Sequence, residues 1–369
     1  MDWSLILQNA VAAIVAGEVV TYALAAIGLN IHFGYTGLLN FGQAGFVALG
    51  AYAVGMGIVT YGLPLWLALL VGFAAVAVLA LLLGVPTLRL RADYLAIVTI
   101  AAAEIIRLFF RAASLEEWTG GADGIQGYIR EFRSLNPFPR GDYGAGWFTY
   151  AEDDLFILLL GWTLVALCLL LTFLLMRSPW GRVLKSIRED EDAVRSLGKN
   201  VFVYKMQSLV LGGMIGCLAG FMFAFDYAVA QPNIYSTELT FFLYTIMILG
   251  GAARVFGPVV GSMIFWAILS FTDNFLNQGV REGLIPNWLM DATQVGQVRF
   301  MIISSISARP TSMNRTCPTW VEFMIQFGIR PSRTPWFRKL SVNDKIAQKI
   351  IEPRTGPNTR AAPPRIMIV

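Results

Sequence analysis

An unbroken apolar run, DLFILLLGWTLVALCLLLTFLLM, occupies residues 154–176. A helix of about 22 residues rises about 33 Å, which is enough to cross the hydrocarbon core of a bilayer, about 30 Å thick. Runs of the same kind stand at residues 64–84 and 206–228. These three segments therefore predict helices that cross a membrane.

The composition of the whole chain agrees with this prediction. Of its 369 residues 56% are hydrophobic and 14% are charged, and the mean hydropathy is +0.61. A soluble domain has about a quarter charged residues, so a soluble protein is excluded. We predict an all-α polytopic membrane protein with about eight or nine transmembrane helices, at residues 8–29, 36–59, 64–84, 93–113, 154–176, 206–228, 238–252, 257–275 and 295–304. The segments 238–252 and 295–304 are too short to span a bilayer alone.

Lysine and arginine predict which connections face the cytoplasm. The 177–205 connection is the most basic, and the short connections that contain Arg89 and Arg254 are basic as well. Threading the helices alternately places four connections inside: 30–35, 85–92, 177–205 and 253–256. The N-terminus and three connections then face outward: 114–153, 229–237 and 276–293. The predicted transmembrane domain is residues 1–304, with an outer loop at 114–153.

The composition changes abruptly after residue 304. Residues 305–369 carry eleven Lys or Arg, three acids and half of the sixteen prolines, a net charge of +8. Such a segment buries too little apolar surface to offset the entropy of ordering it. We expect this tail to be disordered, or to be foreign to the fold through a change of reading frame near residue 303.

Few residues suit catalysis or metal binding. His32 is the single histidine, and the cysteines, Cys168, Cys217 and Cys317, form no CxxC pair. No Walker A pattern occurs. We therefore expect no catalytic residue, no metal site and no cofactor, and we expect His32 at the edge of a loop. A membrane-embedded enzyme is a less favoured alternative, because the one acidic cluster, residues 189–192, has the pattern of a helix cap.

The 177–205 connection predicts two short helices. Ser178 and Pro179 suit the start of the first helix, and Asp190 can cap the second. Glu191 and Asp192 would stand in the first turn of the second helix, with Gly198 after its end. Ala193, Val194 and Leu197 would line one side. This segment is either a solvated loop or a helix that docks a cytoplasmic partner, with contacts from Arg188, Glu189, Asp190, Glu191, Asp192, Ala193, Leu197 and Gly198.

Two glycine-rich interruptions predict broken or re-entrant segments. The first is GYTGLLNFGQAG at residues 34–45, and the second runs from Gly250 to Pro258. Paired interruptions in the two halves of a transporter suggest internal inverted repeats around a central pathway, although close helix packing also explains single glycines. Glu104 and Arg107, three residues apart, can pair within an apolar span. The predicted pathway residues are Gly37, Asn40, Gly42, Gln43, Glu104, Gly251 and Gly257.

Five ordered motifs carry a family resemblance: GYTGLLNFGQAGFVALGAY (34–52), RLRADYLAIVTIAAAEIIRL (89–108), TGGADGI (119–125), GRVLKSIREDEDAVRSLG (181–198) and LGGAARVFGPVVG (249–261). Over roughly residues 10–303 the chain resembles the permease subunits of branched-chain amino-acid ABC importers. The outer loop with TGGADGI is similar to that of the M-type subunit rather than the shorter H-type subunit. After about residue 300 the chain departs from the family pattern.

The resemblance implies a function and a set of partners. It implies an ATP-driven importer in a bacterial inner membrane, embedded in lipid and without nucleic acid. ATP hydrolysis would sit on separate ATP-binding subunits, beside an H-type permease and an extracytoplasmic amino-acid-binding protein. Residues 192–198 stand where the family has its coupling segment for the ATPase. Two alternatives remain: a permease of the same family for urea or another small polar solute, and an ion-coupled secondary amino-acid transporter.

Overall fold

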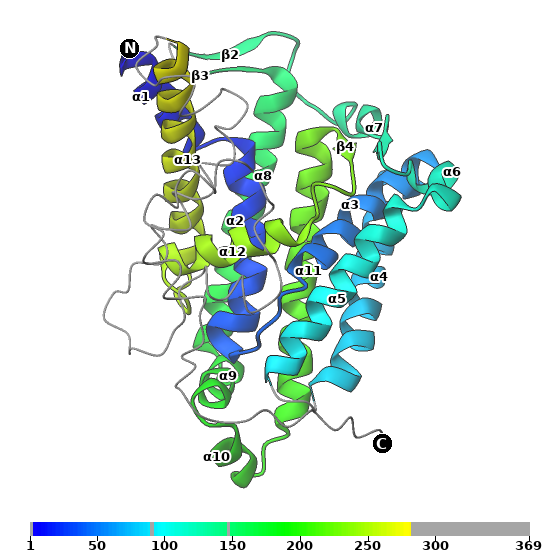
Figure 1. Ribbon diagram of the computed structural model, residues 1–369, viewed down its shortest axis with the longest axis vertical. Coiled ribbons are helices and arrows are strands. Elements are labelled where there is room, and N and C mark those ends of the chain that lie inside the picture. Colours follow the sequence, from blue (N-terminus) through cyan, green and yellow to red (C-terminus); the bar gives the residue numbers. More distant parts are fainter. Residues whose placement is uncertain (1–2, 89–91, 146–147, 282–369) are drawn as a thin grey trace, which may run out of the picture. The chain divides into compact units, whose positions relative to one another are not determined.

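The computed structural model describes residues 3–88, 92–145 and 148–281, and these form a polytopic helical membrane protein (Figure 1). Its longer helices are α1 (Trp3–Ala13), α2 (Gly17–Leu29), α3 (Gln43–Val59), α4 (Leu65–Thr87), α5 (Ala92–Arg111), α8 (Glu152–Arg177), α9 (Pro179–Glu189), α11 (Val201–Tyr227), α12 (Thr237–Gly250) and α13 (Gly257–Arg281). The short helices are the π-helix η1 (Asn30–Tyr35), the 3-10 helix η2 (Ala113–Leu115), α6 (Glu116–Thr119), α7 (Ile129–Arg133) and α10 (Glu191–Ser196).

Within the described residues, four helices are long and apolar enough to cross a membrane: α4, α8, α11 and α13 through Gly279. The helix α1 and residues 17–35 meet the same criterion only when taken together, as one broken span or a re-entrant loop with a bend of 41°. Because the break falls between Ala13 and Gly17, the segment expected at 8–29 is two helices rather than one. The helix α5 is 20 residues long and carries charged residues, and α3 and α12 are shorter apolar helices.

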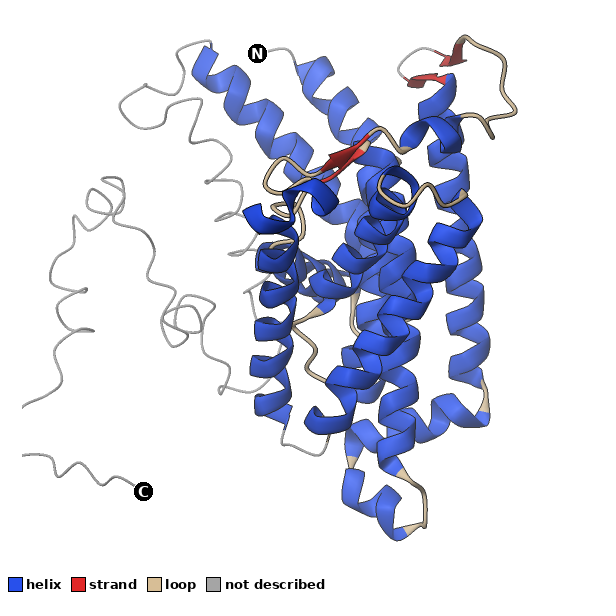
Figure 2. Cartoon of the chain, turned by 90° about the vertical axis from the view of Figure 1, so that its right-hand side faces the viewer, coloured by secondary structure: helices blue, strands red, loops and turns tan. Residues whose placement is uncertain are grey.

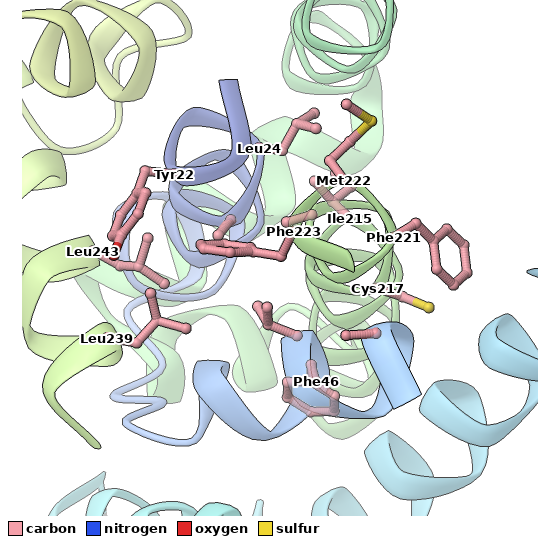
Figure 3. Close-up of a cluster of buried hydrophobic side chains, with 14 of the residues drawn as sticks. Tyr22, Leu24, Phe46, Ile215, Cys217, Phe221, Met222, Phe223, Leu239 and Leu243 are labelled. Carbon is pink, nitrogen blue, oxygen red and sulfur yellow. The ribbon is translucent and has the colours of Figure 1, made fainter. Parts of the chain in front are cut away.

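The pattern of burial separates central from peripheral helices. The helices α4 and α8 each bury one narrow stripe, such as Gly72, Val76 and Ala80 on α4, and expose the opposite face. The helices α2 and α11 are buried around most of their circumference. A helix that is buried on all sides lies in the interior of the bundle, whereas a helix that buries only one stripe lies at its edge, with the opposite face toward lipid. Figure 3 shows the core, where side chains of α2, α3, α11 and α12 converge around Phe223.

Two short antiparallel ribbons interrupt the expected all-α fold. The strand β1 (Ile125–Gln126) pairs with β4 (Val229–Ala230), and β2 (Asp142–Ala145) pairs with β3 (Phe148–Ala151). Both ribbons lie at one end of the bundle, which we call the strand end, and α9 and α10 lie at the other (Figures 1 and 2). The connections expected to face outward, 114–153 and 229–237, therefore meet at the same end, as the alternate threading predicts.

Several predicted boundaries are wrong. Residues 30–35 are not a loop, because they continue α2 as a π-helix in which Asn30 and His32 are buried. The segment expected at 36–59 becomes helical only at Gln43, because Gly37 adopts a left-handed φ of +75° and residues 37–42 are not helical. The segment 295–304, the boundary at 304/305 and the tail 305–369 lie outside the described residues.

Candidate functional site

The predicted pair of short helices is confirmed as α9 and α10. The Ser178 hydroxyl accepts a hydrogen bond from the Gly181 amide, with Pro179 in the first position of α9. The carboxylate of Asp190 accepts hydrogen bonds from the amides of Asp192 and Ala193, at 2.9 and 3.0 Å, and so caps α10. At the far end of α10, Gly198 has a φ of +74° and its amide donates to the Arg195 carbonyl. The next amide, that of Lys199, donates to the Val194 carbonyl. These two bonds together form a Schellman motif at the end of α10.

The apolar side chains of α10 do not share one face, which corrects the sequence prediction. Val194 is buried in an apolar cluster with Tyr35, Met176, Leu184, Ile187 and Val201. Leu197, by contrast, is 79% exposed, and Ala193 is exposed as well. Val194 therefore anchors α10 to the end of the bundle, and Ala193 and Leu197 form a small apolar surface exposed to solvent.

Ion pairs brace this hairpin. Glu191 forms a salt bridge with Lys205 at the start of α11 and a second one with Arg195 at 2.9 Å. Arg195 also binds Asp192 at 2.9 Å, but the side chain of Asp192 is 88% exposed. Glu191 therefore connects α10 to a spanning helix, whereas Asp192 faces outward from the hairpin.

Arg188 connects the hairpin to the first glycine interruption. Its guanidinium donates a hydrogen bond of 2.6 Å to the Gly34 carbonyl, 154 residues earlier in the chain. A Cβ atom at Gly37 would lie 3.2 Å from the Arg188 side chain. The left-handed backbone of Gly37 thus brings the interruption directly against α9.

The two glycine interruptions lie against each other, since a Cβ atom at Gly34 would be 2.8 Å from the Ala253 amide nitrogen. The Asn30 amide nitrogen donates to the Arg254 carbonyl, and its oxygen accepts from the Ala253 amide, both at 2.9 Å. Gly251 has a φ of +93°, and a Cβ atom at Gly257 would lie 2.5 Å from the Gly251 carbonyl oxygen, so the second interruption is a tight turn. We call residues 30–37, 253–254 and Arg188 together the glycine junction.

Backbone groups that the first interruption leaves free are bonded by other helices. The Phe41 amide donates to the Thr99 hydroxyl of α5, and the Ala44 amide donates to the Thr240 hydroxyl of α12, each at 3.1 Å. The Tyr244 hydroxyl donates to the Asn40 carbonyl. Irregular backbone at membrane depth persists where such partners replace the helical hydrogen bonds.

Asn40 and Gln43 are fully buried and form a network with His32. His32 Nε2 lies 3.0 Å from the Leu209 carbonyl, which can only accept, so Nε2 carries the proton and Nδ1 accepts from the Asn40 amide at 3.0 Å. The Asn40 oxygen accepts from the Gly42 amide, and Gln43 donates to the Ala25 carbonyl. The expectation that His32 lies at the edge of a loop is therefore wrong.

A cavity of about 310 Å³ opens between the hairpin and the first interruption. Its walls come from the first interruption, the end of α4, the hairpin and the adjoining parts of α5 and α11: Thr36, Gly37, Leu38, Thr87, Leu88, Leu95, Ile187, Arg188, Glu189, Glu191 and Lys205. The cavity thus brings Gly37 together with Arg188, Glu189 and Glu191. The other residues predicted for the pathway, Asn40, Gly42, Gln43, Glu104, Gly251 and Gly257, do not line it.

Glu104 pairs with Arg107 as the spacing predicts, with Arg107 Nε 3.0 Å from the carboxylate. The pair lies on α5, apart from the network of Asn40. Sequence reasoning missed Asn30, Thr99, Thr240 and Tyr244, which hold the interruptions in place. Their partners lie 58 to 224 residues away in the chain, so no local pattern marked them.

Three curated proteins illustrate the similarity to known sequences. The chain is 32% identical over 260 residues to the "High-affinity branched-chain amino acid transport system permease protein LivM" of Salmonella typhimurium, covering 68% of this chain and 61% of the relative. A "Probable branched-chain amino acid transport permease protein LivM" of Methanocaldococcus jannaschii is 26% identical over 66% of this chain and 76% of its own length. The "Nucleoside ABC transporter permease protein NupC" of Lactococcus lactis is 26% identical over 51% of this chain and 59% of its own length.

No solved structure matches this chain. The chain spans about three fifths of the length of the Salmonella relative. Residues 11–296 match the family described as "Branched-chain amino acid transport system / permease component", so the match covers the whole described bundle from within α1 onward. The chain therefore belongs to the branched-chain amino acid transport system permease family.

Proposed function

We propose that this chain is the M-type permease subunit of an ATP-driven importer of branched-chain amino acids in a bacterial inner membrane. The observation that carries the proposal is the hydrogen bond from Arg188 to the Gly34 carbonyl. It joins a capped, outward-facing helical hairpin to a broken helix inside the bundle. An importer whose ATPase is a separate subunit needs such a connection between a docking surface and its pathway.

The hairpin has the features of a docking element. Leu197 and Ala193 present apolar surface to solvent, and Asp192 adds an exposed carboxylate that is paired with Arg195. Local caps at Asp190 and Gly198 keep the element rigid. A rigid element transmits a displacement of the bound ATPase, through Arg188, to the glycine junction. The pathway would then open beside Gly37, Asn40, Gly42 and Gln43.

The wider assembly follows from the same proposal. Two ATP-binding subunits would bind at the α9–α10 end, which would face the cytoplasm, and an extracytoplasmic binding protein would deliver substrate to the strand end. An H-type permease would complete the pathway within the lipid bilayer. The chain would cross the membrane eight or nine times, with the two glycine interruptions related as inverted repeats.

Leu197→Asp tests the docking role. It places a charge on the exposed apolar surface and touches none of the capping bonds, so we expect the subunit to insert normally and co-purification of the ATP-binding subunit to fall about tenfold. Leu135→Asp, at an exposed leucine of the outer loop, is the matched control and should leave co-purification unchanged. Equal recovery of the ATPase with both variants would refute docking at α10.

Charge reversal at Glu191 and Asp192 distinguishes a role in docking from a role in stabilising the hairpin. Asp192→Lys removes only the exposed ion pair with Arg195, whereas Glu191→Lys also removes the salt bridge to Lys205 on α11. We expect both variants to uncouple ATP hydrolysis from uptake in proteoliposomes, and Glu191→Lys alone to lower thermal stability as well. Wild-type uptake by the double variant Glu191→Lys/Asp192→Lys would contradict the coupling role.

Substrate class needs its own measurement, because the relatives that this chain resembles are named for amino acids and for nucleosides. Uptake of labelled leucine by the complete reconstituted complex should require ATP and should be displaced by isoleucine and valine, not by urea or uridine. Uptake that follows an ion gradient without ATP would instead identify a secondary transporter.

A further inference from the structure

Three buried tyrosines lie close to the strand end of the bundle: Tyr52 on α3, Tyr128 just before α7 and Tyr235 just before α12. Their exposed fractions are 1%, 0% and 2%. The Tyr128 hydroxyl donates to the Ala224 carbonyl in the last turns of α11, at 2.8 Å. The hydroxyls of Tyr52 and Tyr235 have no hydrogen-bond partner among the described residues. A buried hydroxyl without a partner is uncommon in native proteins and needs an explanation.

These hydroxyls belong to one cluster, which we call the tyrosine cluster. The rings of Tyr52 and Tyr235 are 6.2 Å apart and meet edge to face. Burial raises the pKa of Tyr235 well above its ordinary value, and the neighbouring Tyr128 and Tyr52 raise the pKa further. The two unpaired hydroxyls therefore share one buried region rather than two separate ones.

Aromatic faces line this region. Tyr52 stacks on Phe110 of α5 with the ring planes 3° apart, and Phe223 of α11 stands edge-on to Tyr235. Aromatic faces attract an ammonium group and pack against aliphatic side chains. A neutral phenol hydroxyl can donate to a carboxylate or accept from an ammonium group. Together these groups suit a small zwitterion with an apolar side chain, held without a fixed charge.

A short ribbon covers the tyrosine cluster. Tyr128 and Tyr235 stand in the two connections that β1 and β4 join, through the pairs Ile125–Ala230 and Gln126–Val229. Gly55, one turn after Tyr52 on α3, packs beneath this ribbon, since a Cβ atom there would lie 3.4 Å from Ile125. The ribbon has only two residue pairs, but Ile125 and Ala230 are buried in the core, so its separation must also break their packing contacts.

We propose that the Tyr52 and Tyr235 hydroxyls form a subsite for the polar end of a small aliphatic amino acid as it enters the permease beneath the β1–β4 ribbon. This inference rests on the proposed function and deepens it, because it assigns substrate contacts that neither glycine interruption supplies. With the ribbon closed the hydroxyls are unpaired, and with the ribbon open the substrate or its water shell pairs with them.

The double variant Tyr52→Phe/Tyr235→Phe tests the subsite in the complete complex, reconstituted with its ATPase and binding protein. Removing two unpaired hydroxyls should leave the melting temperature unchanged or higher. The number of leucine molecules taken up per ATP hydrolysed should fall about tenfold, which is the effect expected from losing one hydrogen bond to a charged group. Tyr61→Phe is the matched control, because Tyr61 is an exposed tyrosine outside the tyrosine cluster, and it should leave this ratio unchanged.

Two outcomes would overturn the inference. Unchanged leucine uptake per ATP in the double variant would show that the hydroxyls do not contact substrate. A lower melting temperature in both single variants would show that the hydroxyls have protein partners. Failure of the wild-type complex to take up leucine with ATP would instead remove the proposed function itself, so the two failures are distinguishable.

Discussion

The glycine junction is partly buried and the tyrosine cluster is fully buried, and the two satisfy their polar groups differently. In the glycine junction, Asn30 bonds Ala253 and Arg254, and Arg188 bonds the Gly34 carbonyl. In the tyrosine cluster, the hydroxyls of Tyr52 and Tyr235 lack partners within the described residues. A paired buried network holds one arrangement, whereas an unpaired group favours any rearrangement that supplies a partner.

This difference indicates how the two ends of the bundle are built. The junction joins residue 30 to residue 254 and is bonded to the hairpin through Arg188, so the hairpin and both interruptions are connected. The tyrosine cluster adjoins a ribbon of two residue pairs, and our proposal requires this ribbon to separate when substrate enters. Three further predictions, from the largest expected effect to the smallest, test this contrast.

Asn30→Leu should have the largest effect. It removes both bonds between the interruptions and leaves the Ala253 amide and the Arg254 carbonyl unpaired, which costs about 2–4 kcal/mol of unfolding free energy. Thermal unfolding of the purified subunit in detergent measures the loss. Asn9→Leu, which removes a single side-chain bond to Asn274, should lose about 1 kcal/mol. Equal losses would mean that the glycine junction is not a stabilising unit.

Gly37→Ala should have an intermediate effect. A left-handed backbone costs an L-residue about 1–2 kcal/mol, and the added Cβ also presses on Arg188 at 3.2 Å. Gly62→Ala carries the same strain, at a φ of +61°, with nothing within 4 Å. We expect similar losses of thermal stability in both variants but reduced leucine uptake only in Gly37→Ala. Normal uptake by Gly37→Ala would show that the contact between Gly37 and Arg188 is not needed for coupling.

Tyr128→Phe should have the smallest effect and sharpens the contrast within the tyrosine cluster. Its hydroxyl is bonded to the Ala224 carbonyl, so its removal should lower the free energy of unfolding by about 1 kcal/mol. Tyr235→Phe removes an unpaired hydroxyl and should cause no loss. Denaturant midpoints of the two variants compare them directly, and an equal drop in both would contradict the assignment of Tyr235 as unpaired.

The parts of the site that could be predicted from the sequence depend on hydrogen bonds between residues two to five positions apart. The caps at Ser178, Asp190 and Gly198 and the pair of Glu104 with Arg107 all join near neighbours, so residue type and spacing were sufficient. The long apolar runs likewise predicted α4, α8 and α11, since the thickness of a bilayer sets their length. These features depend on the chain alone or on the membrane around it.

Contacts over long separations were decided by the tertiary structure. The bonds from Asn30 to Arg254, from Arg188 to Gly34 and from Tyr128 to Ala224 join residues 96 to 224 positions apart. The face of α10 that turned inward, Val194 rather than Leu197, likewise depended on the cluster it packs against. Such contacts arise only when packed helices bring distant groups together, and the low polarity of the interior then favours arrangements in which buried polar groups find partners.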